Sequence, residues 1–144
     1  MKKVITHIMI AFAMAGSVQA QTTSAKDKIL GEWFNVDKTG IIEIYKKENK
    51  YYGIIVRGTD KSPTKFDIHN PDPKKQNQLL VGKHILNDFT YDDGEWEDGT
   101  IYNPRNGNTY SCVMVMIDNN VLKITGYIGI TLFGKTQLWT RVVE

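Results

Sequence analysis

The fold of this chain is decided by residues 109–128, which read TYSCVMVMIDNNVLKITGYI. Two apolar runs flank Asp-Asn-Asn at residues 118–120, and Asp and Asn tolerate the positive φ angles that a tight turn needs. In the second run Leu122 and Ile124 alternate with polar residues, which is the pattern of a strand with one buried face and one wet face. The stretch therefore predicts two antiparallel strands joined by a hairpin.

Similar short runs, rich in Ile, Val, Tyr and Trp and separated by Gly, Asn and Asp, recur along the rest of the chain from Ile29. Their spacing of about ten residues is typical of an antiparallel series of strands, and no stretch after residue 20 shows three turns of helical periodicity. The expected strands are Gly31–Val36, Gly40–Lys47, Tyr51–Gly58, Leu79–Phe89, Gly94–Tyr102, Thr109–Asp118, Val121–Ile128 and Lys135–Val143.

About eight strands without a covering helix must protect the polar edges of their sheet, and closure into a barrel removes those edges. We therefore expect an all-β fold, a small antiparallel up-and-down β-barrel. A two-layer sandwich is the competing arrangement.

The N-terminus predicts export. Met1, Lys2 and Lys3 precede an apolar run from Val4 to Ala15, and the small residues up to Ala20 suit a cleavage site. We expect a signal peptide at residues 1–20, a flexible mature N-terminus at 21–28 and one barrel domain at 29–144. The expected location is the periplasm or the exterior, and no later run is long enough to be an integral membrane segment.

The charge balance argues against a nucleic-acid partner. Two of the 18 basic residues, Lys2 and Lys3, lie in the predicted signal peptide, which leaves 16 basic side chains against 16 acidic ones. A phosphate backbone requires a basic surface.

The single cysteine, Cys112, cannot form an intrachain disulfide, and its apolar neighbours predict a buried thiol rather than a nucleophile activated by His69 or His84.

One long segment, residues 59–78, interrupts the regular spacing of strands and turns. It contains three prolines and the stretch DIHNPDP at residues 67–73. Such a loop either has a structural role, stiffened by proline and by Asn and Asp bonding their own backbone, or gates a ligand. The candidate loop contacts are Asp67, His69, Asn70 and Asp72. Nothing nearby has the spacing of a metal site, so neither a metal nor a cofactor is expected.

Five carboxylates surround Trp96, at residues 92–98. Their order is not that of a calcium loop, and neighbouring carboxylates in one hairpin do not provide the fixed separation that a glycosidase needs. A solvated acidic hairpin is the favoured interpretation. Because no catalytic constellation is evident, we do not expect an enzyme.

Aromatic residues are abundant, and they suit either packing in the barrel wall or an apolar cup with polar handles. Strand alternation gives four candidates for the lining of such a cup, Tyr52, Ile54, Tyr110 and Met114. A register error of one residue would move any of them to the other face.

Both ends of the barrel domain carry a recognisable pair of motifs. Gly31-Glu32-Trp33 near the start and Trp139-Thr140-Arg141 near the end resemble the signature of lipocalins and their calycin relatives. The resemblance implies that Trp33 closes the base of the barrel and that Arg141 lies across it, where a guanidinium over an indole face is worth roughly 0.5 to 2 kcal/mol.

A more specific resemblance covers nearly the whole domain and is to a bacterial family of exported lipocalin-like proteins of uncharacterised function. Asn103, Lys135 and residues 74–78 depart from that family's usual residues. The motifs that carry the resemblance are GIIEIY at 40–45, YGIIV at 52–56, DIHNPDP at 67–73, GTIYNP at 99–104, GNTY at 107–110, GYIG at 126–129 and FGKTQLWTR at 133–141.

Three functions stay open at this point. The leading expectation is an exported protein that holds a small apolar or amphipathic ligand in a barrel cup. The alternative is an interaction module with a filled barrel, whose loop at residues 59–78 docks on an envelope protein. A third possibility, an enzyme acting on an amphipathic substrate, would need an acid or base in the cup, and the sequence offers none.

Overall fold

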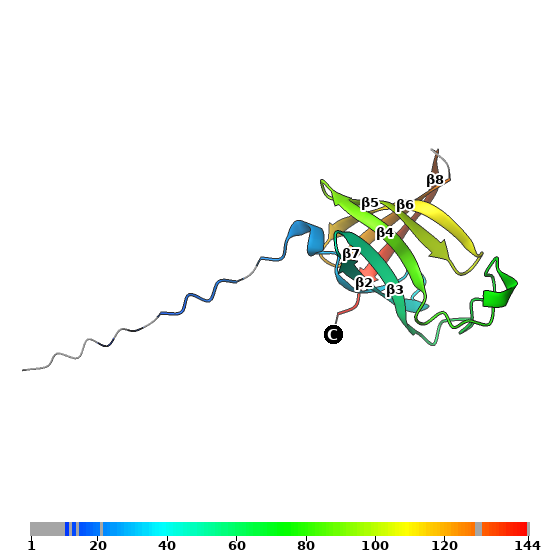
Figure 1. Ribbon diagram of the computed structural model, residues 1–144, viewed down its shortest axis with the longest axis horizontal. Coiled ribbons are helices and arrows are strands. Elements are labelled where there is room, and N and C mark those ends of the chain that lie inside the picture. Colours follow the sequence, from blue (N-terminus) through cyan, green and yellow to red (C-terminus); the bar gives the residue numbers. More distant parts are fainter. Residues whose placement is uncertain (1–10, 12, 14, 21, 129–130, 144) are drawn as a thin grey trace, which may run out of the picture.

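The computed structural model describes residues 11, 13, 15–20, 22–128 and 131–143. Within these residues the chain forms a closed antiparallel barrel in which each strand pairs with the next and β1 pairs with β8 (Figure 1). The predicted barrel of about eight strands is confirmed. The strands are β1 (Gly31–Phe34), β2 (Gly40–Lys47), β3 (Lys50–Gly58), β4 (His84–Asp92), β5 (Glu95–Asn103), β6 (Asn108–Asp118), β7 (Val121–Ile128) and β8 (Thr131–Arg141).

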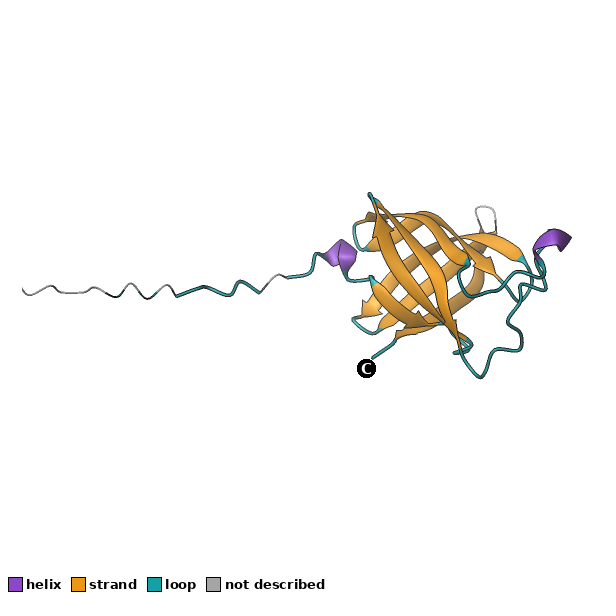
Figure 2. Ribbon diagram, turned by 60° about the horizontal axis from the view of Figure 1, so that its bottom comes forward, coloured by secondary structure: helices purple, strands orange, loops and turns teal. Residues whose placement is uncertain are grey.

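The two ends of the barrel differ. A short 3-10 helix, η1 (Ala25–Asp27), and the hairpins β2–β3, β4–β5 and β6–β7 lie at one end, which we call the N-terminal end. The long β3–β4 connection, with the 3-10 helix η2 (Pro73–Lys75), lies at the opposite end (Figure 2). Among the described residues, no helix is long and apolar enough to cross a membrane.

Two predicted strands are displaced. The expected strand Lys135–Val143 runs instead from Thr131 to Arg141 as β8. The expected strand Leu79–Phe89 begins only at His84, because residues 79–83 belong to the long loop, where Gly82 has φ 93°. At its other end this strand continues to Asp92 and turns through Asp93 and Gly94, with φ of 44° and 89°. Two successive positive φ angles form a tight hairpin turn, for which Asp-Gly is a favoured pair.

The N-terminal segment also differs from expectation. Residues 21–28 are expected to be loose, but Asp27 accepts hydrogen bonds from Tyr51 Oη at 2.8 Å and from Lys46 Nζ at 3.3 Å. The backbone carbonyl of Lys26 accepts a hydrogen bond from Trp96 Nε1 at 3.3 Å. The barrel therefore holds the segment from about residue 25 onward. Of the predicted signal peptide, residues 1–10, 12 and 14 lie outside the described residues.

Candidate functional site

The described interior of the barrel is filled by large side chains. Trp33, Phe89, Leu86 and Met114 are fully buried. Two glycines make room for them, because a Cβ on Gly53 would lie 2.7 Å from Leu86 and a Cβ on Gly99 would lie 2.5 Å from Phe89. The remaining core is also aromatic and aliphatic: Ile29, Ile42, Ile44, Tyr51, Ile55, Ile85, Trp96, Tyr102, Cys112, Leu122, Ile124 and Trp139.

The four residues predicted to line one cup do not share a face. Met114 lies inside the barrel, and Tyr110, half-buried, lies on the same face of β6. Tyr52 and Ile54 instead lie on the outer face of β3, because Tyr51, Gly53 and Ile55 are the buried residues of that strand. Residues 51–56 are apolar or aromatic on both faces, so alternation could not decide which face is inward.

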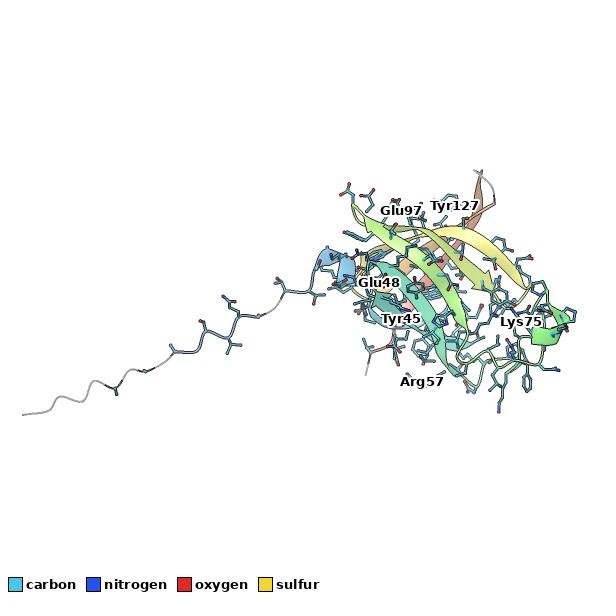
Figure 3. The ribbon with its side chains drawn as sticks, in the orientation of Figure 1. Tyr45, Glu48, Arg57, Lys75, Glu97 and Tyr127 are labelled. Atoms are coloured by element: carbon cyan, nitrogen blue, oxygen red, sulfur yellow. The ribbon has the colours of Figure 1, made fainter. Side chains whose placement is uncertain are left out.

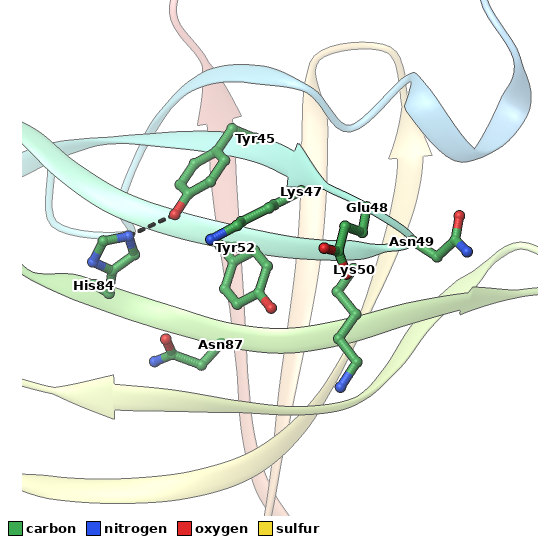
Figure 4. A pocket seen from close by; sticks show the side chains of 8 residues that line it. All are labelled: Tyr45, Lys47, Glu48, Asn49, Lys50, Tyr52, His84 and Asn87. Carbon is green, nitrogen blue, oxygen red and sulfur yellow. Dashed lines mark hydrogen bonds between the residues drawn. The ribbon is translucent and has the colours of Figure 1, made fainter.

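An aromatic cluster occupies the outer wall where β2, β3 and β4 meet. Tyr45 and Tyr52 are direct partners across the β2–β3 ladder, and their ring centroids lie 5.7 Å apart with planes 24° apart. His84 approaches Tyr45 edge-on, and its Nε2 lies 2.6 Å from Tyr45 Oη (Figure 4). Tyr45 and Tyr52 are only half-buried, so their rings remain accessible to a ligand.

This cluster forms part of a surface groove of about 630 Å³, which we call the aromatic groove. Two ammonium groups, one carboxylate and two amides surround the rings, so that the walls offer hydrogen-bond donors and acceptors as well as apolar surface. The residues that line it are Tyr45, Lys47, Glu48, Asn49, Lys50, Tyr52, His84 and Asn87 (Figure 4).

Asp88 at the rim of this groove orients one of the rings. Its Oδ1 accepts a hydrogen bond from Tyr52 Oη at 3.2 Å and lies 3.9 Å from Lys50 Nζ. Partial burial and the neighbouring carboxylate both raise the pKa of Tyr52. Tyr52 therefore keeps its proton at neutral pH and can act as a hydrogen-bond donor.

Trp33 and Arg141 lie together at the N-terminal end. The guanidinium carbon of Arg141 is 4.2 Å from the centroid of the Trp33 ring. Its nitrogens donate to the backbone carbonyls of Lys28 at 2.6 Å, Leu30 at 2.9 Å and Asn119 at 2.7 Å. Arg141 thus joins the N-terminal segment, the last strand and the β6–β7 turn. A smaller hollow of about 280 Å³ lies nearby and includes Trp96 and Met116.

The long loop is attached to the barrel through Asp67, which is 1% exposed. Its carboxylate accepts hydrogen bonds from Tyr102 Oη and Asn70 Nδ2, both at 2.7 Å, and lies 3.1 Å from Lys83 Nζ. Burial opposes ionisation of this carboxyl, but the three partners outweigh burial and lower its pKa. Burial and the Asp67 carboxylate raise the pKa of Tyr102. The ionised carboxylate is therefore the form that holds the loop.

The other predicted loop contacts have separate roles. Asn70 is buried, and its Oδ1 accepts a hydrogen bond from the Asp72 backbone N–H at 2.9 Å. Asp72 caps η2 by accepting a hydrogen bond from the Lys74 backbone N–H at 3.0 Å. The side chain of His69 is exposed, while its carbonyl oxygen lies against Gly107 in the β5–β6 turn. These contacts describe a rigid loop.

The other side chains considered for catalysis or metal binding are not grouped into a site within the described residues. Burial raises the pKa of the Cys112 thiol to about 12, so the thiol is protonated at neutral pH and a poor nucleophile. Within the described residues, no three His, Cys, Asp or Glu side chains are grouped to hold a metal. Trp96 is buried, whereas Asp92, Asp93, Glu95 and Asp98 around it are exposed.

Sequence reasoning missed the pairing of Tyr45 with His84 and that of Asp67 with Tyr102. The stacking of Tyr45 on Tyr52 could have been found from the short Glu48-Asn49 turn, which places the two tyrosines opposite each other. No comparable local signal exists for His84, which is 39 residues from Tyr45.

Comparisons with known proteins agree with the barrel fold. The family described as "Uncharacterized protein conserved in bacteria (DUF2147)" matches residues 31–141. Among solved structures, the chain is similar to protein HP1028 from Helicobacter pylori, which is described as belonging to the lipocalin family. The TM-score is 0.70 with 25% identity over 81% of this chain and 84% of that one. No curated protein matches the chain. The lipocalin-like fold is compatible with the binding of a small molecule.

Proposed function

The chain belongs to the DUF2147 family of conserved bacterial proteins, and we propose that it is a non-enzymatic binding protein that holds a small amphipathic molecule in the aromatic groove. The observation that carries the proposal is the half-exposed stack of Tyr45 and Tyr52 beside His84. Exposed aromatic rings surrounded by a few oriented polar groups are typical of ligand sites, and small-molecule pockets have volumes of about 300–1,000 Å³.

The groove suits a ligand with one flat apolar face. That face would lie on the two tyrosine rings, because aromatic surface gains most from contact with apolar or aromatic groups. The polar groups of the ligand would meet the Asn87 amide and the His84 ring, and an anionic substituent would meet the ammonium groups of Lys47 and Lys50. The proposed ligand class is therefore amphipathic, with a ring or flat apolar portion.

The groove is a better candidate than the interior of the barrel. Leu86 and Phe89 already fill the space above Gly53 and Gly99, so a ligand there would have to displace packed side chains. Of the two interior candidates, Met114 is fully buried and Tyr110 is half-buried. The Tyr110 Oη accepts hydrogen bonds from Asn106 Nδ2 at 2.9 Å and Asn108 Nδ2 at 3.3 Å. Tyr110 thus serves to distinguish the two sites.

We also infer that the protein acts in the periplasm or outside the cell. The support is the N-terminal sequence, in which two lysines precede an apolar run and small residues. Expression of the full chain in a bacterium, followed by fractionation and intact-mass measurement, tests this inference. Recovery in the cytoplasm with residues 1–20 still attached would contradict it.

The test of the binding function is native mass spectrometry of the protein purified gently from its own cells, with denaturing extraction to identify any retained molecule. The identified compound is then titrated into Tyr45→Ala and Tyr52→Ala variants, and we expect affinity to fall about tenfold or more. Tyr127→Ala is the matched control, because Tyr127 is a half-buried tyrosine on β7, which is not adjacent to the groove (Figure 3).

The Tyr110→Ala variant separates the groove from the interior. Retained binding in Tyr110→Ala with loss in Tyr52→Ala supports the groove. The opposite pattern would place the ligand inside the barrel and overturn the proposed site. Repeated preparations without any retained molecule, together with no binding by amphipathic compounds extracted from the same cells, would overturn the binding function itself.

A further inference from the structure

The two arms of the long loop pair in antiparallel fashion at residues 65–67 and 78–80 and continue into turns at Ile68 and Val81. We call residues 65–68 and 78–81 the loop ribbon. The Asp67 N–H donates to the Gln78 carbonyl and the Leu80 N–H donates to the Lys65 carbonyl, both at 2.9 Å. Phe66 and Leu79 are bridge partners between these bonds. Since successive residues of an extended chain point to opposite sides, the ribbon has an inner face and an outer face.

The two faces have different environments. On the inner face, Asp67 is buried against Tyr102 and Leu80 packs on the barrel core. The outer face is apolar and open to solvent. Its paired residues are Phe66, 45% exposed, and Leu79, 56% exposed. Ile68 and Val81, 48% and 50% exposed, lie beside them in the turns 67–70 and 80–83.

The rest of the loop holds the ribbon in this orientation. Asp67 is fixed by Tyr102 from β5 and by Lys83 from the end of the loop. His69 abuts Gly107, where a side chain would not fit. The ribbon therefore cannot turn its apolar face inward without breaking a buried ion pair. A rigid apolar patch of this kind usually marks an interaction surface.

The charges around this patch are mostly positive. Four lysines of the loop are exposed, and the charge of Lys83 is matched by Asp67. The other carboxylates in the loop belong to Asp60 and Asp72, so the exposed lysines outnumber them by four to two. The exposed lysines are Lys61, Lys65, Lys74 and Lys75.

The loop projects from the end of the barrel opposite the N-terminal segment, and Lys75 lies at its outer tip (Figures 2 and 3). A projecting tip that combines apolar side chains with lysines suits a flat anionic surface rather than a concave partner. Lysine is depleted in protein–protein interfaces, which argues against a protein as the occupant.

We propose that the loop ribbon docks this end of the barrel on an anionic lipid surface. Phe66, Ile68, Leu79 and Val81 enter the interface between headgroups and acyl chains, while the lysines face the anionic headgroups. This docking does not depend on the aromatic groove, which lies on the side wall of the barrel.

The experiment is co-sedimentation of the protein with vesicles of phosphatidylglycerol and phosphatidylcholine in equal parts, and with vesicles of phosphatidylcholine alone. The protein is expressed as the full chain, and its intact mass establishes that residues 1–20 have been removed, so that their apolar run does not contribute. We expect binding to the anionic vesicles, weaker binding to the neutral ones, and loss of binding as the salt concentration rises.

Matched variants assign the binding to the ribbon. The double variant Phe66→Ser, Leu79→Ser should bind the anionic vesicles about tenfold more weakly. Its control is Ile117→Ser, Leu138→Ser, because these two side chains are exposed to a similar extent, 58% and 47%, on strands β6 and β8. Lys74→Gln, Lys75→Gln should reduce the dependence on salt. Near-ultraviolet circular dichroism verifies that each variant is folded.

A second readout reports insertion directly. A Phe66→Trp variant should shift its fluorescence emission to shorter wavelength on adding anionic vesicles, and brominated lipids should quench the new emission. Failure of the protein to bind either vesicle would overturn the proposal. Equal losses in the ribbon and control variants, unchanged binding in the ribbon variant, or equal binding to neutral vesicles would also overturn it. If all these variants still bind the ligand of the aromatic groove, ligand binding and docking on lipid are separate functions.

Discussion

Asp67 and Tyr102 are hydrogen-bonded at 2.7 Å although they are 35 residues apart, and this contact joins the long loop to strand β5. Lys83 and Asn70 complete the coordination of the same carboxylate. Every buried side-chain nitrogen and oxygen among the described residues has a partner, so this buried cluster is fully satisfied. A satisfied buried network holds a unique conformation, which explains how a loop of turn-forming residues can have a fixed shape.

The Asp67 contact predicts sensitivity to acid. Its folded pKa lies below the ordinary value of 3.8, so its contribution to stability is complete above that pH and is lost as the pH falls through the folded pKa. Asp67→Asn should lower the free energy of unfolding at neutral pH by about 1–3 kcal/mol. It should also reduce the further decrease in the free energy of unfolding that occurs as the pH becomes acidic. Urea unfolding at several pH values measures both effects. Asp60→Asn, at an exposed position of the same loop, is the control; equal behaviour of the two variants would contradict the prediction.

The contact between the His69 carbonyl and Gly107 predicts that alanine at position 107 lowers the stability of the protein. Gly107 and Gly94 both have positive φ, 73° and 89°, so alanine at either position carries backbone strain of about 1 kcal/mol. At Gly107 the added Cβ also meets the His69 carbonyl oxygen, whereas at Gly94 it meets nothing within 4 Å. Gly107→Ala should therefore lose more stability than Gly94→Ala and raise the amide hydrogen exchange of residues 67–70. Equal effects would show that His69 does not constrain the turn.

The close packing of Phe89 on Gly99 predicts that added volume is not tolerated there. The Cβ of Gly99→Ala would lie 2.5 Å from the Phe89 ring, and such overpacking costs about 1–3 kcal/mol. Gly58→Ala is the control, because nothing lies within 4 Å of its Cβ. Chemical denaturation of both variants measures the difference. A Gly99→Ala variant as stable as Gly58→Ala would indicate room inside the barrel and would favour an interior ligand.

The position of Arg141 predicts a large loss on truncation. Arg141→Ala removes three hydrogen bonds to carbonyls and the contact with the Trp33 ring, and should cost about 2–4 kcal/mol in the free energy of unfolding. Arg141→Lys keeps the charge but not the planar fork, so it should recover only part of the loss. Thermal and urea unfolding measure the series. Unchanged stability in Arg141→Ala would refute its role in closing the barrel.

The burial of Cys112 predicts an unreactive thiol. Because burial raises its pKa to about 12, a disulfide reagent at neutral pH should modify Cys112 only when the barrel opens. The rate of modification should rise with urea in parallel with global unfolding. Fast modification of the native protein would show that the thiol is accessible and reactive.

The barrel could be predicted from the sequence because its signals are local. Alternation in residues 121–125 and Asn-rich or Gly-containing turns specify strands and hairpins over a few residues, and closure follows from the need to protect sheet edges. The bounds of β2 and β7 agree with the predicted strands, while those of β4 and β8 do not. Leu79 to Val81 have strand-like composition, but Leu79 pairs with Phe66 of the loop and not with the barrel.

The groove could not be predicted fully, because the face on which a side chain lies depends on irregularities in the sheet. The register shifts on both sides of Gly53 where β3 pairs with β4, and Asp88 and Asp98 adopt φ of 64° and 62°. Each bulge reverses the alternation beyond it. On β3 itself burial alternates regularly, so Tyr52 and Ile54 were assigned to the wrong face because residues 51–56 are apolar or aromatic on both faces.

The sequence by itself therefore determined most of the strands and hairpins and favoured a closed antiparallel barrel, because hydrophobic period and turn chemistry act over short distances. Only the tertiary structure decided that Tyr45 meets His84, that Asp67 meets Tyr102 and that the apolar side chains of the loop ribbon face outward. These contacts join residues far apart in the chain, and packing around bulges and glycines, rather than any local preference, selects them.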